Sequence, residues 1–274
     1  MKARSLLELA GFRSPPRTYG YRVDTFELER EGSVRFAQWL HPKCRTITLD
    51  QQAVDELRRY IAPGDAVLDI GAHIGDTTVP FALAAGPTGR VFAVEPNRYV
   101  LPILERNALL NPMAAPITIL PYAATKETAA LTFDYSDPGF CNGGDLSGLG
   151  KLRGWHLYRL DVEGRNITRE LESLAPEWLS RVKFVKTDTE GNDRAVVETL
   201  RKLIDTARPY LLCEIFRRSD EAQRRSFHRL LSTDLNYRIY RADPYVELRG
   251  KELGADDMMK ERHFDVFCVP AELA

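Results

Sequence analysis

The sequence predicts a doubly wound α/β domain with a mostly parallel seven-stranded sheet and an antiparallel hairpin at its C-terminal edge. From about residue 51 onward, short apolar stretches of strand length alternate with segments whose apolar residues recur at helical spacing. The last two apolar stretches have no clear helix between them, so we expect them to pair antiparallel. Residues 1–50 are predicted to form an N-terminal extension, partly β, ahead of one domain at 51–274.

The individual elements follow from local patterns along the chain. Within the extension, weak alternation of apolar and polar residues predicts β structure at 26–30 and 45–49. Asp76 or Thr77 is expected to cap the helix that follows the first core strand. Core strands are predicted at 66–70, 90–95, 117–120, 182–188, 209–214, 237–240 and 264–269, and helices at 52–61, 77–85, 99–111, 196–204 and after a cap at Ser219.

The composition argues against several classes of partner. The formal net charge is −1 over 274 residues, so neither nucleic acid nor an anionic membrane surface is an expected partner. No apolar stretch reaches membrane-spanning length, and the apolar run near the N-terminus is too short for a signal peptide. The four cysteines lack metal-ligand spacing, which favours reduced thiols and a cytoplasmic protein. Whether the chain forms a homo-oligomer stays open.

The turn after the first core strand, VLDIGAHIGD (67–76), is a candidate binding site. Open α/β sheets bind ligands at the carboxyl ends of their strands, and Gly71 and Gly75 can let a ligand approach the backbone closely. The spacing is G-x-x-x-G rather than G-x-G-x-x-G, so the dinucleotide fingerprint is incomplete. Asp69 and Asp76 flank the turn, where two carboxylates would repel a pyrophosphate but attract a cation.

Glu95 indicates that the ligand is a nucleoside. It ends the second core strand, near the spacing of roughly 20 residues at which an acid binds both hydroxyls of a ribose. A nucleoside with a positive charge and no phosphate fits this pattern, and S-adenosylmethionine has these properties. Alternatively, the two glycines only form a tight strand–helix turn. The residues expected to contact S-adenosylmethionine are Asp69, Gly71, Ala72, His73, Gly75, Asp76, Thr77, Glu95, Pro96, Asn97, Tyr122 and Ala123.

Several stretches share the motifs of one enzyme family. They are IAPGDAVLDIGAHIGDTTVPFA (61–82), VFAVEPN (91–97), PYAAT (121–125), FVKTDTEGND (184–193), PYLLCEIF (209–216) and FDVFCVP (264–270). In these stretches the chain resembles the FkbM-type S-adenosylmethionine-dependent methyltransferases, and the DTEG segment is the most specific of the motifs. The resemblance implies a Rossmann-like class I methyltransferase fold and O-methylation of a sugar, glycan or natural-product hydroxyl.

The strand at 182–188 carries the candidate catalytic residues. A buried lysine needs a partner, and alternation places Lys186 and Asp188 on one face near the carboxyl end of the strand. Their pairing would keep Asp188 ionised, as a base that deprotonates the acceptor hydroxyl requires. Glu190 is the second choice for this base, and His156, which follows the long loop, is the third. The alternative is a purely structural ion pair between Lys186 and Asp188.

The Gly-, Asp- and Ser-rich stretch at 134–156 is interpreted as a loop that closes over the acceptor. Its polar groups suit a polyhydroxylated ligand, and its aromatic rings can cover a sugar ring. An exposed connection built from turn-forming residues is the alternative. The residues expected to bind a small-molecule or glycan acceptor are Tyr135, Asp137, Phe140, Asn142 and Glu214.

Two further chemistries share some of these residues. Asp188, Glu190 and Glu214 could together bind a divalent ion such as magnesium, but their spacing does not require it, so no metal is predicted. A nicotinamide-dependent oxidoreductase would share the glycine turn and Glu95. The acids around the turn and the missing third glycine disfavour that alternative.

Overall fold

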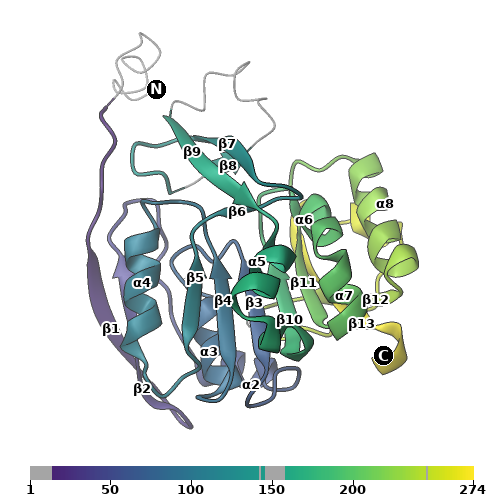
Figure 1. Cartoon of the computed structure of the whole chain (residues 1–274), viewed down its shortest axis with the longest axis horizontal. Coiled ribbons are helices and arrows are strands. Elements are labelled where there is room, and N and C mark those ends of the chain that lie inside the picture. Colours follow the sequence, from purple (N-terminus) through teal and green to yellow (C-terminus); the bar gives the residue numbers. More distant parts are fainter. Residues whose placement is uncertain (1–13, 142, 146–157, 245) are drawn as a thin grey trace.

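The computed structural model describes residues 14–141, 143–145, 158–244 and 246–274. Within these residues the main sheet contains the strands β3 (Ala66–Ile70), β4 (Arg90–Val94), β5 (Ile117–Leu120), β10 (Val182–Thr187), β11 (Tyr210–Ile215), β12 (Tyr237–Ala242) and β13 (Phe264–Pro270). Their order is β12–β13–β11–β10–β3–β4–β5 (Figure 1). β11, β10, β3, β4 and β5 run parallel, and β13 is antiparallel to both of its neighbours. The predicted fold class, including the C-terminal hairpin, is confirmed.

Helices cover both faces of this sheet. One core contains side chains from α2 (Gln51–Leu57), α3 (Thr78–Ala85) and α4 (Leu101–Leu110), and the other contains side chains from α5 (Ile167–Leu174), α6 (Asp193–Thr199), α7 (Arg201–Ala207) and α8 (Glu221–Arg229). Successive residues of β3 alternate between the cores, so Val67 packs in the first and Leu68 in the second. All of β3 is therefore buried. None of the helices in the described part of the chain is both long and apolar enough to cross a bilayer.

Short helical turns complete the described elements. They are the 3₁₀ helices η2 (Pro176–Arg181), η4 (Asp257–Met259) and η5 (Ala271–Leu273), and the π-helical turn η3 (Leu230–Asp234) after α8. Two predicted caps differ in the structure. Asp220 rather than Ser219 caps α8, because its side chain accepts the amide of Gln223 at 2.8 Å. Thr77 has the N-cap position of α3, but its hydroxyl donates to Asp69 instead of capping the helix.

The order of the strands determines where a ligand can bind. β4 and β5 extend the sheet on one side of β3, and β10 and β11 extend it on the other. The chain therefore switches sides between β3 and β10, and the loops after these two strands diverge to opposite faces. Open α/β sheets bind their ligands in the crevice at such a switch point.

A small second sheet stands above the carboxyl ends of the parallel strands (Figure 1). In the described residues it contains β6 (Ala123–Ala124), β7 (Ala129–Tyr135), β8 (Gly143–Asp145) and β9 (Tyr158–Arg165), in the order β6–β9–β7–β8. The interpretation of 134–156 as one loop is therefore wrong at its start, which ends β7, and at 143–145, which form β8. The glycine-rich composition gave no sign of these strands. β7 pairs with β8 inside the stretch and with β9 after it.

Phe140 belongs to the core of this small sheet. It is buried, its ring stacks on Tyr99 with the centroids 4.2 Å apart, and Tyr135 and Tyr158 pack against its edges. The prediction that this ring contacts the acceptor is therefore wrong, because the strands that bury Phe140 were not predicted.

An antiparallel hairpin precedes the main sheet and packs on α4. It consists of β1 (Tyr21–Leu28) and β2 (Gly32–Trp39). The buried Asn107 of α4 replaces a neighbouring strand: it accepts the amide of Ala37 at 2.6 Å and donates to the carbonyl of Ala37 at 3.1 Å. Asn107 also donates to the carbonyl of Ile74 at 2.8 Å. One side-chain amide thus connects the hairpin to the glycine turn.

The predicted strand at 45–49 is not present. Ile47 is buried there, but its backbone bonds to a side chain, with Gln38 Oε1 accepting the amide and Gln38 Nε2 donating to the carbonyl. The alternating pattern correctly indicated burial of every second residue. It did not reveal that a glutamine side chain takes the place of a strand partner.

Candidate active site

A cavity of about 460 Å³ lies at the carboxyl ends of β3, β4, β10 and β11, below the small sheet. Small-molecule sites commonly have volumes of about 300–1,000 Å³, so a nucleoside-sized ligand fits. Its wall combines the glycine turn, the loops after β4 and β10, and side chains of β7. The predicted site residues that line it are Gly71, His73, Asp76, Thr77, Glu95, Pro96, Asn97, Ala123, Tyr135, Lys186, Asp188, Glu190 and Glu214.

Other predicted site residues lie away from this wall or outside the described residues. Tyr122 points away, because its hydroxyl donates to Glu170 at 3.2 Å. The buried carboxylate of Asp137 lies 2.9 Å from Nε2 of His41 and also accepts the amide of Gly139. These contacts give both side chains structural partners. Away from the wall are Asp69, Ala72, Gly75, Tyr122, Asp137 and Phe140, and outside the described residues are Asn142 and His156.

The two glycines of the turn are required by packing within the chain. Gly71 has a φ of +82°, and a Cβ on it would lie 2.0 Å from the carbonyl oxygen of Asp188. Gly75 has a φ of +95°, and a Cβ there would approach Leu104 Cδ1 to 3.1 Å. We predicted that a ligand would pack closely against Gly71, but in the structure the loop after β10 does so. The tight strand–helix turn accounts for the geometry of both glycines.

The backbone amides of this turn bond to the neighbouring strand. The amides of Gly71 and Ala72 donate to the carbonyl of Val94 at 2.9 and 3.1 Å, and the amide of His73 donates to Glu95 Oε2 at 2.9 Å. Turns that bind phosphate aim such amides at the ligand. Because these three donors are already used, the turn suits a ligand without a pyrophosphate at this position.

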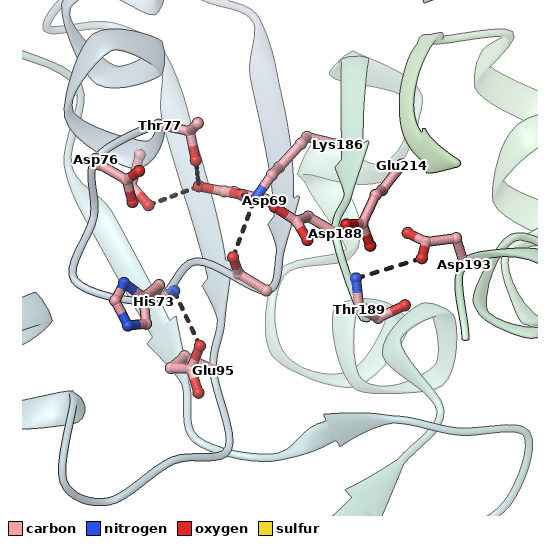
Figure 2. Close-up of polar contacts among 12 residues, drawn as sticks. Asp69, His73, Asp76, Thr77, Glu95, Lys186, Asp188, Thr189, Asp193 and Glu214 are labelled. Carbon is pink, nitrogen blue, oxygen red and sulfur yellow. Dashed lines mark hydrogen bonds and ion pairs between the residues drawn. The ribbon is translucent and has the colours of Figure 1, made fainter. Parts of the chain in front are cut away.

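Glu95 is held in place from two sides. Its Oε2 accepts the amide of His73 (Figure 2), and its Oε1 accepts the amide of Asn97 at 2.8 Å. Burial raises the pKa of Glu95 to about 7, although the two amide bonds act in the opposite direction. Each carboxylate oxygen can accept a second bond, and the residue lines the cavity. The arrangement suits the two hydroxyls of a ribose.

Lys186 is buried at the centre of the site, but its main partner was not predicted. Its Nζ donates to the carbonyl of Gly71 at 2.9 Å and lies 3.3 Å from Asp69 Oδ1, compared with 3.8 Å from Asp188 Oδ2. Burial lowers the pKa of Lys186, but the carboxylates of Asp69 and Asp188 outweigh it and the net pKa is raised. The lysine is therefore a cation shared by two acids.

Asp69 is fully buried behind the turn. Its Oδ2 accepts the hydroxyls of Thr77 and Thr78 at 2.9 and 2.6 Å, and Oδ1 faces Lys186. The prediction that Asp69 faces the cofactor is wrong, because Asp69 does not line the cavity and Lys186, near the end of β10, lies against its carboxylate. Its role is to hold Lys186 and the start of α3 together.

The other end of the cavity is rich in carboxyl groups (Figure 2). Burial, followed by the charge of Asp188, raises the pKa of Glu214 to about 10. The same two causes raise the pKa of Asp193 to about 7 and that of Asp265 to about 6. Asp188 is the accessible member, with 49% of its side chain exposed. In the described part of the chain, no group of three or more His, Cys, Asp or Glu residues has an arrangement that could hold a metal.

Four residues of this region with acidic, basic or imidazole side chains were not predicted. Arg45, His263 and Asp265 line the cavity, and Asp193 begins α6 beside it. An acid within the otherwise apolar stretch FDVFCVP was a usable signal for Asp265, by the same reasoning that singled out Lys186. No local pattern marked Arg45 or His263, because both come from irregular segments that only the folded chain brings to the cavity.

Comparison with known proteins identifies the family. A sequence profile described as "Methyltransferase FkbM domain" matches residues 69–239. The chain belongs to this family of methyltransferases. The match includes the end of β3 with the glycine turn, Glu95, and Lys186 with Asp188. Among proteins of curated function, no sequence matches the chain.

Solved methyltransferase structures are similar at low sequence identity. The FkbM methyltransferase from Methylobacillus flagellatus KT is 18% identical, with a TM-score of 0.46, over 75% of this chain and 43% of that one. The chain therefore spans less than half the length of that protein. Aeropyrum pernix fibrillarin, solved with natively bound S-adenosylmethionine, is 14% identical, with a TM-score of 0.44, over 94% of this chain and 98% of that one. A precorrin-6y C5,15-methyltransferase from Geobacter metallireducens GS-15 is 12% identical, with a TM-score of 0.42, over 82% and 93%.

Proposed function

We propose that this FkbM-family methyltransferase transfers a methyl group from S-adenosylmethionine to a hydroxyl of a sugar, glycan or natural-product acceptor. The observation that carries the proposal is the anchored carboxyl of Glu95, which lines a nucleoside-sized cavity beside a turn whose amides are already bonded. A ribose with hydroxyls and no adjacent pyrophosphate complements this arrangement. When bound, S-adenosylmethionine supplies an electrophilic methyl group on a sulfonium.

The residues of the chain bind the ribose, accept the proton and position the loops. Glu95 accepts the ribose hydroxyls, and the loop that carries Pro96 and Asn97 borders the nucleoside. Asp188 takes the proton from the acceptor hydroxyl as its oxygen receives the methyl group. Lys186 holds the loop after β10 against the turn through the carbonyl of Gly71 and stays beside Asp188. Glu190 is the second candidate for the base, since it lines the same cavity.

The oxidoreductase alternative is weaker. Tyr122 and Lys126 have the Tyr-x-x-x-Lys spacing found in some nicotinamide-dependent enzymes. The hydroxyl of Tyr122 donates to Glu170, however, and does not line the cavity. The family match is to methyltransferases.

Calorimetric titration of the full chain tests the cofactor. We expect S-adenosylmethionine and S-adenosylhomocysteine to bind and NAD not to bind. Binding of NAD alone would overturn the proposal. For the acceptor, methyl transfer to a panel of sugars and polyhydroxylated natural products is followed by mass spectrometry and NMR. A methyl group on nitrogen or carbon in every product would contradict O-methylation.

A further inference from the structure

Three acids form a row on one face of the main sheet. Glu214 lies directly opposite Asp265 in the antiparallel ladder between β11 and β13, so their side chains share a face. Thr187 pairs with Cys213 in the parallel ladder between β10 and β11, which places the following residues, Asp188 and Glu214, side by side. Asp188, Glu214 and Asp265, here called the acidic row, all line the cavity.

Glu214 is the buried member of the acidic row. Only 6% of its surface is exposed, and its Oε2 has no hydrogen-bond partner among the described residues. Its Oε1 lies 3.4 Å from Nδ1 of His263, whose side chain is 53% exposed. Figure 2 shows the carboxyl of Glu214 turned toward those of Asp188 and Asp193. A buried carboxyl oxygen without a donor is unfavourable, so this position lacks a donor that a ligand can supply.

Negative charge accumulates around the row. Glu190, from the loop after β10, and Asp193, from α6, add two carboxyl groups that act on Glu214. Lys186 faces the row but is already shared between Asp69 and Asp188. His263, when protonated, would supply one positive charge at the exposed side. Like charges directly opposite each other destabilise a sheet, so this arrangement is unfavourable unless Glu214 keeps a proton or a cation occupies the site.

We propose that the acidic row binds a protonated amine of the methyl acceptor, so that the acceptor is a hydroxyl compound with a nearby ammonium group, such as an amino sugar or an aminocyclitol. This inference rests on the proposed function and narrows its substrate class. Three N–H donors of an ammonium group can satisfy Glu214 Oε2 and bond to Asp188 and Asp265 at the same time. The hydroxyl next to the amine then lies beside Asp188, the proposed base.

Other ligands match these groups less well. A neutral hydroxyl could donate to Glu214 but would leave the repulsion within the row unchanged. A divalent metal requires several oxygen ligands around one point, and the described residues contain no cluster of that kind. An ammonium group supplies both the missing donor and the missing charge.

Binding of the amine is coupled to release of a proton. With a pKa of about 10, Glu214 is protonated at pH 7. An ammonium group beside it favours the carboxylate, so its proton leaves when the amine binds. Calorimetry in two buffers of different ionisation enthalpy measures this release. We expect up to one proton per amine bound in the wild type and a smaller release in Glu214→Gln.

The decisive experiment compares matched pairs of probes. Glucosamine is titrated against glucose, and 2-deoxystreptamine against a neutral cyclitol, into the protein saturated with S-adenosylhomocysteine at pH 7. We expect each amine to bind about tenfold or more tightly than its neutral partner, as one charge-assisted hydrogen bond allows. Equal affinity within both pairs, or no detectable binding of either amine, overturns the proposal.

Two variants test whether the acidic row causes the preference for an amine over its neutral partner. Glu214→Gln and Asp265→Asn keep the size of the side chain and remove its ability to become negative, so both should reduce the preference for the amine severalfold. Glu198→Gln is the matched control, because Glu198 is exposed on α6 and pairs with Arg194. An undiminished preference in both row variants would show that the amine binds elsewhere. If either variant fails to fold, the titration of the other and the proton release in the wild type decide.

The remaining alternative is that the acidic row binds the positive charge of the cofactor rather than that of an acceptor amine. The same pairs are therefore titrated in the presence of sinefungin, whose protonated amine stands in for the sulfonium methyl group. If the amines still bind more tightly than their neutral partners when sinefungin is bound, the acids bind an acceptor amine. If the amines bind more tightly only when S-adenosylhomocysteine is bound, the acids bind the charge of the cofactor. Failure of S-adenosylhomocysteine to bind the wild type would instead contradict the proposed function, so the two failures are distinguishable.

Discussion

The two ends of the cavity hold their carboxyl groups in opposite ways. At one end, both oxygens of Glu95 accept backbone amides. At the other end, Glu214 has an oxygen without a donor in the described residues and lies opposite Asp265. A carboxyl group with satisfied hydrogen bonds keeps its position without a ligand, whereas a crowded one gains most when a ligand arrives. Recognition of neutral hydroxyls can thus be built into the backbone, whereas a site for a cation brings acids so close together that one of them keeps a proton until the cation binds.

The largest effect is expected from Gly71→Ala, because the turn joins the two ends. The added Cβ would lie 2.0 Å from the carbonyl of Asp188 at a φ of +82°, so the loop after β10 must move. We expect a loss of about 3 kcal/mol or more in the free energy of unfolding, from strain and clash together. Urea denaturation measures it. Gly20→Ala, where nothing lies within 4 Å of the added atom, is the control. Equal stability of the two variants would contradict the packing argument.

Asp188→Asn should separate chemistry from cofactor binding. The substitution keeps the shape of the side chain and removes the base, so we expect the turnover number to fall about 10²–10⁴-fold. The affinity for S-adenosylhomocysteine should stay within about twofold, because the proposed ribose contact lies at the end of β4. Steady-state kinetics with an acceptor identified from the panel, together with titration, measure both. Near-normal turnover would move the role of base to Glu190 and then to His156.

Glu95→Ala should weaken cofactor binding at the end of the cavity where the carboxyl group has its hydrogen bonds satisfied. Loss of charge-assisted contacts to two ribose hydroxyls costs about 2–3 kcal/mol, which corresponds to roughly 30- to 150-fold in affinity. Titration with S-adenosylhomocysteine measures the loss. The exposed Glu105 of α4 provides the control variant Glu105→Ala, which should bind normally. An unchanged affinity of Glu95→Ala would remove Glu95 from the cofactor site.

The smallest effect concerns the pH dependence of stability without ligand. Burial raises the pKa of Glu214 to about 10 from an ordinary value of 4.5. The folded chain therefore keeps a proton that the unfolded chain loses above about pH 4.5, so this group makes folding less favourable as the pH rises from about 5 to 9. Between pH 5.5 and 8.5 we expect the Tm of the wild type to fall more than that of Glu214→Gln. The difference between the two falls should be a few degrees. Parallel curves for the two proteins would show that Glu214 is not crowded in solution.

Some features of the site could be read from short stretches of sequence. Glu95 directly follows a strand and Gly71 begins a turn, and both features depend on residues within a few positions along the chain. The partner of Lys186 could not be found in this way. Alternation pointed to Asp188, two residues away, but the closer carboxylate belongs to Asp69 on the adjacent strand. The register between β3 and β10 decides this pairing, and a long segment of chain separates the two strands.

By itself, the sequence determined the α/β alternation, the parallel sheet with its C-terminal hairpin, and the end of the sheet at which the cavity lies. These properties depend on periodicity and chain reversal, which are local. The tertiary structure alone decided that Phe140 is buried, that a small sheet covers the cavity, and that Glu214 faces Asp265. The physical reason is that hydrogen-bond ladders between distant segments set which side chains become neighbours. Burial among those neighbours then determines their charge.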